Sequence, residues 1–255
     1  MVGVYFSGTG NTQYCVRQFL SKYDETASMI SIEDSAAIQA IKENDFIVFA
    51  YPVYYSNLPK IVRDFLEENK QYFRHKKIFI MATMALFSGD GAGCSARLFH
   101  SYGADVIGGI HIKMTDCIAD IKLLKRSLEK NMHIVANAEK KINKTVIELK
   151  KGKPKREGIN IFYRIAGLLV QRLWLYNKTK KYSDKLRINQ IQCIGCGRCC
   201  KECPMNNLEL HNGAVITKGL CTECYRCVNN CPKQAITLNG HKVYEQCNIE
   251  RYTRV

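Results

Sequence analysis

The sequence has no apolar segment that is both long and uncharged, which argues against a secreted or membrane-spanning protein. Residues 1–6 lack a basic region and run directly into Ser7, so they do not have the pattern of a secretory leader. Residues 159–176 are apolar, but Arg164 and Arg172 interrupt them, and two arginines make a poor membrane span. We therefore expect a cytoplasmic protein, in which disulfides are rare.

Nucleic-acid-binding patterns are also absent, although the chain is strongly basic. Its formal net charge is +15, and residues 140–187 hold 15 Lys or Arg against 3 Asp or Glu. No helix-turn-helix, zinc-finger or RNP pattern accompanies these charges, so we expect no nucleic-acid binding. The apolar residues 159–176 lie inside this stretch and predict an amphipathic helix. We favour packing of that helix on the rest of the protein, and contact with an anionic membrane surface is an alternative.

Cysteine, by contrast, is abundant. The chain has 13 cysteines, and most of them lie between Cys193 and Cys231. Such a density in a cytosolic chain indicates metal or redox chemistry rather than disulfides. Two segments fit the pattern C-x2-C-x2-C-x3-C-P, one ending at Pro204 and the other at Pro232. In this pattern three close cysteines bind one [4Fe-4S] cluster, and the fourth binds the other cluster.

The spacing therefore predicts two crossed sets of four ligands. One set is Cys193, Cys196, Cys199 and Cys231, and the other is Cys221, Cys224, Cys227 and Cys203. An Asn-Gly pair follows each motif, at residues 212–213 and 239–240, and each pair predicts a hairpin. The repeat resembles bacterial two-cluster ferredoxins. This resemblance implies a small α+β domain over residues 188–245, followed by a tail over 246–255.

Two other kinds of protein also use clustered cysteines. Zinc sites use pairs of cysteines separated by a longer spacer, which the two interleaved motifs do not match. A radical enzyme that uses S-adenosylmethionine usually has the spacing C-x3-C-x2-C, and we do not expect that class here. Cys200 could replace Cys199 in a shifted register, but Val228 occupies the equivalent place in the second motif, so we interpret Cys200 as a bystander. The cysteines outside the motifs are expected to be buried free thiols: Cys15, Cys94, Cys117 and Cys247.

Residues 1–150 alternate between apolar strands and helices. Strands are expected over residues 2–6, 29–32, 45–50, 77–83 and 104–112. Helices are expected over residues 12–22, 35–43, 60–72, 93–102 and 119–150. This alternation predicts an α/β domain whose five-stranded parallel sheet is covered by helices on both faces. The loops that follow the strands then lie at one edge of the sheet.

The loop after the first strand has the composition of an anion-binding loop. It reads Ser7-Gly8-Thr9-Gly10-Asn11-Thr12 and leads into a helix, so backbone N–H groups and hydroxyls surround an anion at the helix N-terminus. It is neither a Walker loop nor a G-x-G-x-x-G fingerprint. The loop resembles the phosphate loop of flavodoxins. The resemblance implies the flavodoxin-like strand order 2-1-3-4-5, with FMN at the switch point of the sheet.

The resemblance to flavodoxins also implies which residues contact FMN. The phosphate is expected at Ser7, Thr9, Gly10, Asn11 and Thr12. The loop after the third strand is expected beside the flavin ring through Pro52, Val53, Tyr54, Tyr55 and Ser56. The loop after the fourth strand is expected to contribute Thr83, Met84, Phe87, Ser88 and Gly89. Three of these aromatic residues are candidates for stacking on the ring: Tyr54, Tyr55 and Phe87.

The order of these parts resembles the flavodoxin–ferredoxin fusion proteins common in clostridia and other anaerobes. The expected organisation is an FMN-binding domain over residues 1–150, a basic linker over 151–187, and then the ferredoxin domain. The resulting hypothesis is an iron–sulfur flavoprotein that passes electrons between a redox partner, two [4Fe-4S] clusters and FMN. The basic charge favours an acidic ferredoxin or a reductase as that partner.

Two alternatives remain open at this point. The first is a non-catalytic ferredoxin carried on an FMN-free, flavodoxin-like docking scaffold. The second is an FMN-dependent reductase of a small substrate, for which Tyr54, Tyr55 or Ser88 could supply a proton. No catalytic residue is assigned, because none of these side chains sits in a recognisable catalytic constellation.

Overall fold

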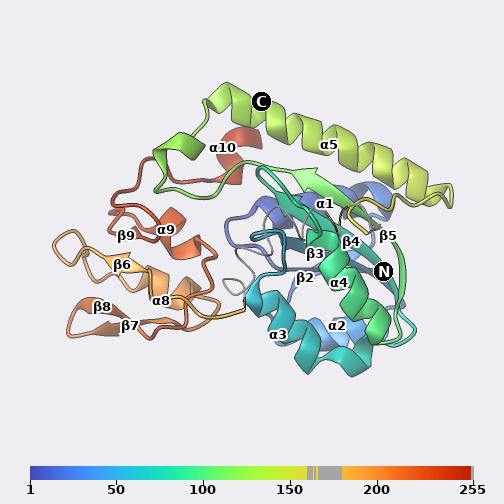
Figure 1. Cartoon of the computed structure of the whole chain (residues 1–255), viewed down its shortest axis with the longest axis horizontal. Helices are drawn as coiled ribbons and strands as arrows, with labels where there is room; N and C mark the ends of the chain where they lie inside the picture. Colours follow the sequence, from blue (N-terminus) through green and yellow to red (C-terminus); the bar gives the residue numbers. More distant parts are fainter. Residues whose placement is uncertain (160–162, 164, 166–179, 254–255) are drawn as a thin grey trace.

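The computed structural model describes residues 1–159, 163, 165 and 180–253. Nearly all of the apolar helix expected over residues 159–176 therefore lies outside the described residues. The described chain forms two domains that lie side by side in Figure 1. The N-terminal domain holds a five-stranded sheet, and the C-terminal domain holds the two cysteine motifs.

The sheet of the N-terminal domain is parallel throughout, with the strand order β2-β1-β3-β4-β5. This order confirms the flavodoxin-like fold expected from the sequence. The strands are β1 (Val2–Tyr5), β2 (Ser28–Ser31), β3 (Phe46–Pro52), β4 (Lys77–Met84) and β5 (Asp105–Lys113). The three central strands are nearly continuous runs of buried residues, as strands covered on both faces require.

Helices cover both faces of the sheet (Figure 1). One face packs against α1 (Asn11–Tyr23) and α5 (Leu128–Lys150). The other face packs against α2 (Ala37–Glu43), α3 (Lys60–Glu68) and α4 (Gly91–Ser101). A short 3-10 helix, η1 (Lys70–Phe73), follows α3. The apolar stripe of each amphipathic helix thereby closes one of two hydrophobic cores.

The helix expected over residues 119–150 is shorter than the periodicity predicted. It begins at Leu128, where Ser127 caps it by accepting a hydrogen bond from the Lys130 N–H at 3.3 Å. Residues 119–127 are instead irregular, with a single 3-10 turn, η2 (Lys122–Leu124). This segment is not helical because its backbone and the Asp120 carboxylate bind the C-terminal domain.

The C-terminal domain contains two small antiparallel sheets and two short helices. Strand β6 (Arg187–Ile188) pairs with β9 (Ile236–Thr237), and β7 (Leu208–His211) pairs with β8 (Ala214–Thr217). The helices α8 (Arg198–Glu202) and α9 (Arg226–Asn230) occupy equivalent places in the two motifs. The expected α+β arrangement with an internal repeat is therefore observed.

The two Asn-Gly pairs behave differently. Asn212 and Gly213 form the predicted hairpin between β7 and β8, with φ angles of 49° and 79°. The hairpin predicted at 239–240 is wrong, because β9 pairs with β6 and not with a strand that follows it. The N–H groups of residues 238–240 instead donate to one carboxylate oxygen of Asp120, at 2.6 to 3.0 Å.

The C-terminal segment returns to the N-terminal domain. Helix α10 (Ile249–Thr253) packs against α5, and Tyr252 is buried in the same core as α1 and α5 (Figure 1). Between the domains, Asn229 donates to the Cys117 carbonyl at 2.9 Å, and its own oxygen accepts from the Cys247 N–H at 2.6 Å. These contacts fix the C-terminal domain against the segment that follows β5.

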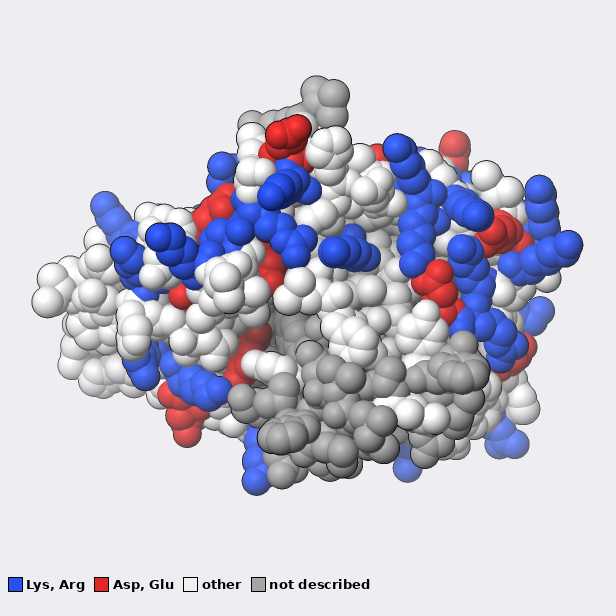
Figure 2. Space-filling view, turned by 45° about the horizontal axis from the view of Figure 1, so that its top comes forward, with Lys and Arg blue, Asp and Glu red and all other residues white. Residues whose placement is uncertain are grey.

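Lys and Arg side chains are prominent on the face shown in Figure 2, and acidic side chains are fewer there. The basic character expected from the sequence is therefore spread over this face rather than confined to one patch. Among the described residues, no helix combines the length and the apolar character needed to cross a bilayer.

Asp120 is the polar centre of the contact between the domains, and its removal should weaken that contact. Besides the three N–H groups, its carboxylate accepts from the Tyr225 hydroxyl at 2.9 Å. Burial raises the pKa of Asp120, but these hydrogen bonds outweigh burial, so the pKa lies below its usual value. We expect Asp120→Asn to reduce the free energy of unfolding by about 2 kcal/mol. Urea unfolding of anaerobic protein would measure this loss, and an equal loss in the exposed Asp105→Asn control would contradict it.

Candidate functional site

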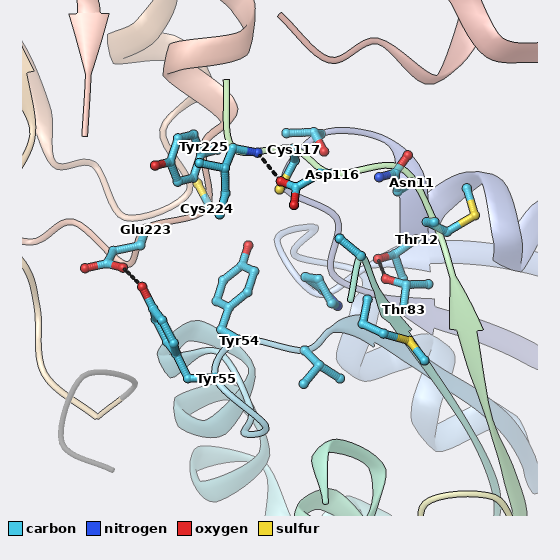
Figure 3. A pocket seen from close by; sticks show the side chains of 18 of the residues that line it. Asn11, Thr12, Tyr54, Tyr55, Thr83, Asp116, Cys117, Glu223, Cys224 and Tyr225 are labelled. Carbon is cyan, nitrogen blue, oxygen red and sulfur yellow. Dashed lines mark hydrogen bonds between the residues drawn. The ribbon is translucent and has the colours of Figure 1, made fainter. Parts of the chain in front are cut away.

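A cavity of about 310 Å³ opens at the carboxyl edge of the sheet, where the two domains meet (Figure 3). Its walls come from the loops that follow β1, β3, β4 and β5, and from residues 222–225 of the second cysteine motif. Switch points at this edge are the usual ligand sites of open parallel sheets. The size lies at the lower end of the range for small-molecule and cofactor sites.

The loop after β1 presents donors toward this cavity. Gly10 adopts a φ of 93° and starts α1 without a side-chain cap, so the first N–H groups of the helix have no partner within the helix. Ser7 Oγ accepts from the Gly10 N–H at 3.1 Å, which keeps the loop tightly curled. Thr12 shares a buried hydrogen bond of 2.8 Å with Thr83 Oγ1, which links the loop to β4. The loop therefore has the geometry of an anion site at a helix N-terminus.

The loop after β3 forms a tight turn without glycine. The backbones of Tyr54 and Asn57 exchange hydrogen bonds of 3.1 and 2.9 Å, and the intervening Tyr55 and Ser56 have φ angles of 50° and 56°. These angles resemble a type I′ turn, which non-glycine residues adopt at some cost. The turn aims Tyr54 into the cavity toward Cys224, as Figure 3 shows.

Tyr55 connects this turn to the C-terminal domain. Its hydroxyl donates to the Glu223 carboxylate at 3.2 Å (Figure 3). Burial, together with the neighbouring Glu223 carboxylate, raises the pKa of Tyr55 to about 12. Burial also raises the pKa of Tyr54 well above its usual value, with the Cys117 thiol as the next cause. Both phenols therefore remain protonated at neutral pH.

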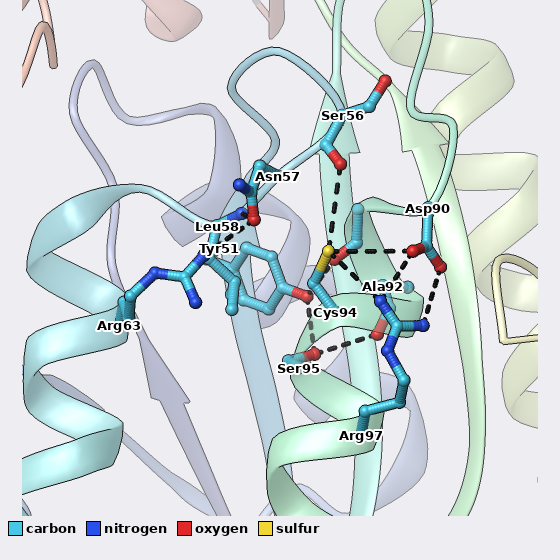
Figure 4. Close-up of polar contacts among 11 residues, drawn as sticks. Tyr51, Ser56, Asn57, Leu58, Arg63, Asp90, Ala92, Cys94, Ser95 and Arg97 are labelled. Atoms are coloured by element: carbon cyan, nitrogen blue, oxygen red, sulfur yellow. Dashed lines mark hydrogen bonds and ion pairs between the residues drawn. The ribbon is translucent and has the colours of Figure 1, made fainter. Parts of the chain in front are cut away.

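A buried polar network supports the turn from behind (Figure 4). Arg97 on α4 makes a two-pronged ion pair with Asp90, at 3.1 and 2.6 Å. The Cys94 thiol faces the Ser56 carbonyl at 3.9 Å, while the Arg63 guanidinium donates to Asn57 Oδ1 at 2.8 Å. These contacts hold the strained turn in one conformation.

Most of the residues expected at FMN line the cavity. They are Ser7, Thr9, Asn11, Thr12, Pro52, Val53, Tyr54, Tyr55, Thr83, Met84 and Phe87. Four of the expected residues do not line it: Gly10, Ser56, Ser88 and Gly89. Ser88, for example, is turned away from the cavity and is hydrogen-bonded to His111 Nδ1 at 2.7 Å. These four residues are therefore not confirmed as part of the cavity.

Two groups stand out among the lining residues that were not expected from the sequence. The first is the loop after β5, Met114 to Ile118, which reaches the cavity because β5 ends at the same edge of the sheet. The switch-point rule could have identified this loop. The second group is Thr222, Glu223, Cys224 and Tyr225 of the second cysteine motif. No local signal marks these residues, because only the docking of the two domains brings them to the cavity.

The predicted cysteine sets line two smaller cavities in the C-terminal domain. The cavity of the second motif, called the second cysteine cavity below, is lined by Cys203, Cys221, Cys224 and Cys227, among other residues. The cavity of the first motif is lined by Cys193, Cys196, Cys199 and Cys231, among other residues. Each cavity thus combines three cysteines of one motif with the fourth cysteine of the other. All these thiols are free, and the four thiolates that a cubane requires can converge in each place.

The remaining cysteine patterns do not produce a site. The C-x3-C-x2-C spacing does occur, at Cys196, Cys200 and Cys203, but Cys196 and Cys203 lie on different cavities. Cys200 lines neither of the two cysteine cavities, in line with its interpretation as a bystander. Within the described chain, no three His, Cys, Asp or Glu side chains are grouped closely enough to hold a single metal ion.

The large cavity and the second cysteine cavity share a wall. Thr222, Cys224 and Tyr225 line both of them. Among the described residues, the Thr222 hydroxyl is one of the few buried side-chain atoms that lack a hydrogen-bond partner. An unpaired buried hydroxyl beside two cavities is consistent with a bound ligand that would supply its missing hydrogen bond. The donors of the loop over residues 7–12, called the phosphate loop below, fit the phosphate of FMN. The thiols of the two cysteine cavities fit iron–sulfur clusters.

Comparisons with known proteins agree with this arrangement. A family model described as a flavodoxin domain matches residues 3–98, and a 4Fe-4S dicluster domain matches residues 179–236. No curated protein matches the chain. The two domains define an electron-transfer protein with flavin and iron–sulfur chemistry. The chain is a fusion of a flavodoxin domain and a ferredoxin-type 4Fe-4S domain.

Several solved structures resemble the N-terminal domain. Flavodoxin from Megasphaera elsdenii is 22% identical with a TM-score of 0.40, over 44% of this chain and 85% of that chain. A Fusobacterium nucleatum flavodoxin bound to flavin mononucleotide is 16% identical with a TM-score of 0.42, over 60% and 98%. Rubredoxin oxygen:oxidoreductase from Desulfovibrio gigas is 13% identical with a TM-score of 0.43, over 60% of this chain and 36% of that chain.

Gly8 lies where the phosphate loop meets the second cysteine motif, and a side chain there should disturb the large cavity. A Cβ atom at Gly8 would overlap the carbonyl oxygen of Cys224 and lie 3.4 Å from the Tyr54 hydroxyl. We expect Gly8→Ala to weaken FMN binding by about tenfold, because the two loops must separate. Quenching of flavin fluorescence would measure the affinity. Gly152→Asn is the control, since no atom of the described residues lies within 4 Å of a Cβ atom at that position. Equal affinities in both variants would refute the prediction.

Proposed function

We propose that this protein passes electrons between a redox partner, two [4Fe-4S] clusters and FMN. The observation that carries the proposal is the wall shared by the large cavity and the second cysteine cavity, with Cys224 on both sides of it. A bound FMN supplies one- and two-electron chemistry, and each bound cluster supplies one-electron chemistry. The two kinds of site are thus adjacent, as a short electron path requires.

The residues around the large cavity support FMN as its ligand. The phosphate would be held by the loop from Ser7 to Thr12 and the N-terminus of α1. The flavin ring would lie between the loop after β3 and the loop after β4, with Tyr54, Tyr55 and Phe87 at its sides. The strained turn holds both tyrosines, and Glu223 additionally holds Tyr55 through its hydroxyl. This support pre-organises the ring site before the ligand binds.

The crossed cysteine sets support two clusters. Cys221, Cys224, Cys227 and Cys203 would hold the cluster next to FMN. Cys193, Cys196, Cys199 and Cys231 would hold the other cluster, whose cavity shares no lining residue with the large one. The site that contains Cys196 is the more open to solvent, because Cys196 is exposed, whereas Cys224 of the other site is buried. The partner is therefore expected at the Cys196 end of the molecule.

The surface around Cys196 supports a partner that is a small acidic electron carrier. Ile194, which is 59% exposed, and Lys233 line this cavity, while Ile191, close by in the sequence, is 97% exposed. An exposed apolar centre with a basic neighbour suits a transient, electrostatically steered encounter.

The crossed ligand sets can be tested with paired cysteine substitutions. Crossed pairing places Cys203 and Cys221 on one cluster, and Cys193 on the other. Cys203→Ser combined with Cys221→Ser should therefore lose no more than one cluster, about four of eight irons, while Cys203→Ser with Cys193→Ser should lose both. Iron, sulfide and released flavin would be measured on anaerobically purified protein.

The unaltered protein and Cys200→Ser are the references for this experiment. Both should hold about eight irons and one FMN, since Cys200 lines neither cysteine cavity. Iron without flavin, even after FMN is added, would replace the proposal by a ferredoxin on a docking scaffold. Zinc in place of iron would overturn the proposal.

The partner surface predicts a directional effect of one substitution. Ile194→Glu adds a negative charge at the Cys196 end and should slow reduction by an acidic ferredoxin by about tenfold at low salt. Ile147→Glu on α5 is the matched control, because Ile147 is 54% exposed but lies on a helix of the other domain. Stopped-flow rates at two salt concentrations would test this. Similar rates for both variants would exclude this surface.

A further inference from the structure

Arg226, in the second cysteine motif, uses its whole guanidinium group at the contact between the domains. Nε donates to the Gly8 carbonyl at 3.3 Å, and Nη2 donates to the Ser7 carbonyl at 2.9 Å. Nη1 and Nη2 each donate to one Glu33 carboxylate oxygen at 2.6 Å, and Nη1 also donates to the Glu202 carbonyl at 3.0 Å. An arginine has five N–H donors, so these five hydrogen bonds use all of them.

These partners surround the two neighbouring redox sites. Ser7 and Gly8 belong to the phosphate loop, and their carbonyls face Arg226. Arg226 itself lies between Cys224 and Cys227, while Glu202 directly precedes Cys203. One side chain therefore joins the phosphate loop to both segments that supply the second cysteine set.

The internal repeat provides a direct comparison. Arg198 occupies the place of Arg226 in the first motif, because each arginine directly precedes the third cysteine of its motif. Among the described residues, the guanidinium of Arg198 pairs within its own helix, with Glu202 at 2.8 Å. The side chain of Arg198 is 55% exposed, against 18% for that of Arg226. The second motif thus uses its arginine at the contact between the domains, whereas the equivalent arginine of the first motif lies at the surface.

We propose that Arg226 is a positioning residue that holds the second cysteine loop against the phosphate loop and so fixes the spacing of the two redox sites. This inference rests on the proposed function. Glu33 neutralises the charge of Arg226, so the residue acts through its directed hydrogen bonds rather than through a net field. Lysine could not replace it, because an ammonium group lacks the planar fork that binds a carboxylate and two carbonyls together.

The test compares Arg226→Gln with Arg198→Gln, the same change in the two repeats. In protein that retains its iron, Arg226→Gln should weaken FMN binding by about tenfold and slow electron exchange between flavin and clusters, whereas Arg198→Gln should change neither. Amide hydrogen exchange of residues 7–12 should also become faster in Arg226→Gln before FMN is added. This last measurement does not depend on the activity of loaded protein.

Glu33→Gln serves as a second variant, because it leaves the guanidinium and its bonds to the carbonyls in place. It should give the same changes as Arg226→Gln, only smaller. Unchanged FMN affinity and unchanged hydrogen exchange in Arg226→Gln would overturn the positioning role. Absence of electron exchange in the unaltered protein would instead refute the proposed function, and the hydrogen-exchange comparison would still decide the role of Arg226.

Discussion

The close backbone contact between Gly8 and Cys224 is the constraint on which the rest of the structure depends. It brings the phosphate loop of one domain against a cysteine loop of the other, with no room for a side chain between them. A contact this close is possible only at glycine. It is also the reason that the large cavity and the second cysteine cavity share a wall.

Directed hydrogen bonds hold the two domains together at this contact. Asp120, Asn229 and Arg226 each bind backbone groups of the other domain. Hydrogen bonds depend strongly on distance and angle, so they specify a register that apolar packing alone would leave loose. Helix α10 adds an apolar contact, because Tyr252 is buried in the core beside α1 and α5. Under the proposed function, these hydrogen bonds would keep the FMN site and the neighbouring cluster site at a fixed spacing.

The sequence predicted the features that depend on local pattern. Apolar runs gave the strands, and the cysteine spacing gave two crossed sets that the structure gathers in two cavities. Features that depend on distant partners were missed. Asn239-Gly240 has hairpin chemistry, but Asp120 binds its N–H groups, and the helical periodicity before Ser127 is overridden by the same contact. The cavity residues Thr222 to Tyr225 could not be identified, because no local pattern encodes how two domains dock.

The two halves of the internal repeat have diverged according to what they face. Gly197 and Tyr225 occupy equivalent positions and share a left-handed backbone, with φ of 69° and 62°. Glycine adopts this conformation without strain, whereas tyrosine does so at a cost of about 1 kcal/mol. The Tyr225 hydroxyl offsets that cost by bonding Asp120 and Asn239 at the domain contact. The strained Tyr225 thus lies in the repeat beside the large cavity, and the unstrained Gly197 lies in the repeat that is more exposed to solvent.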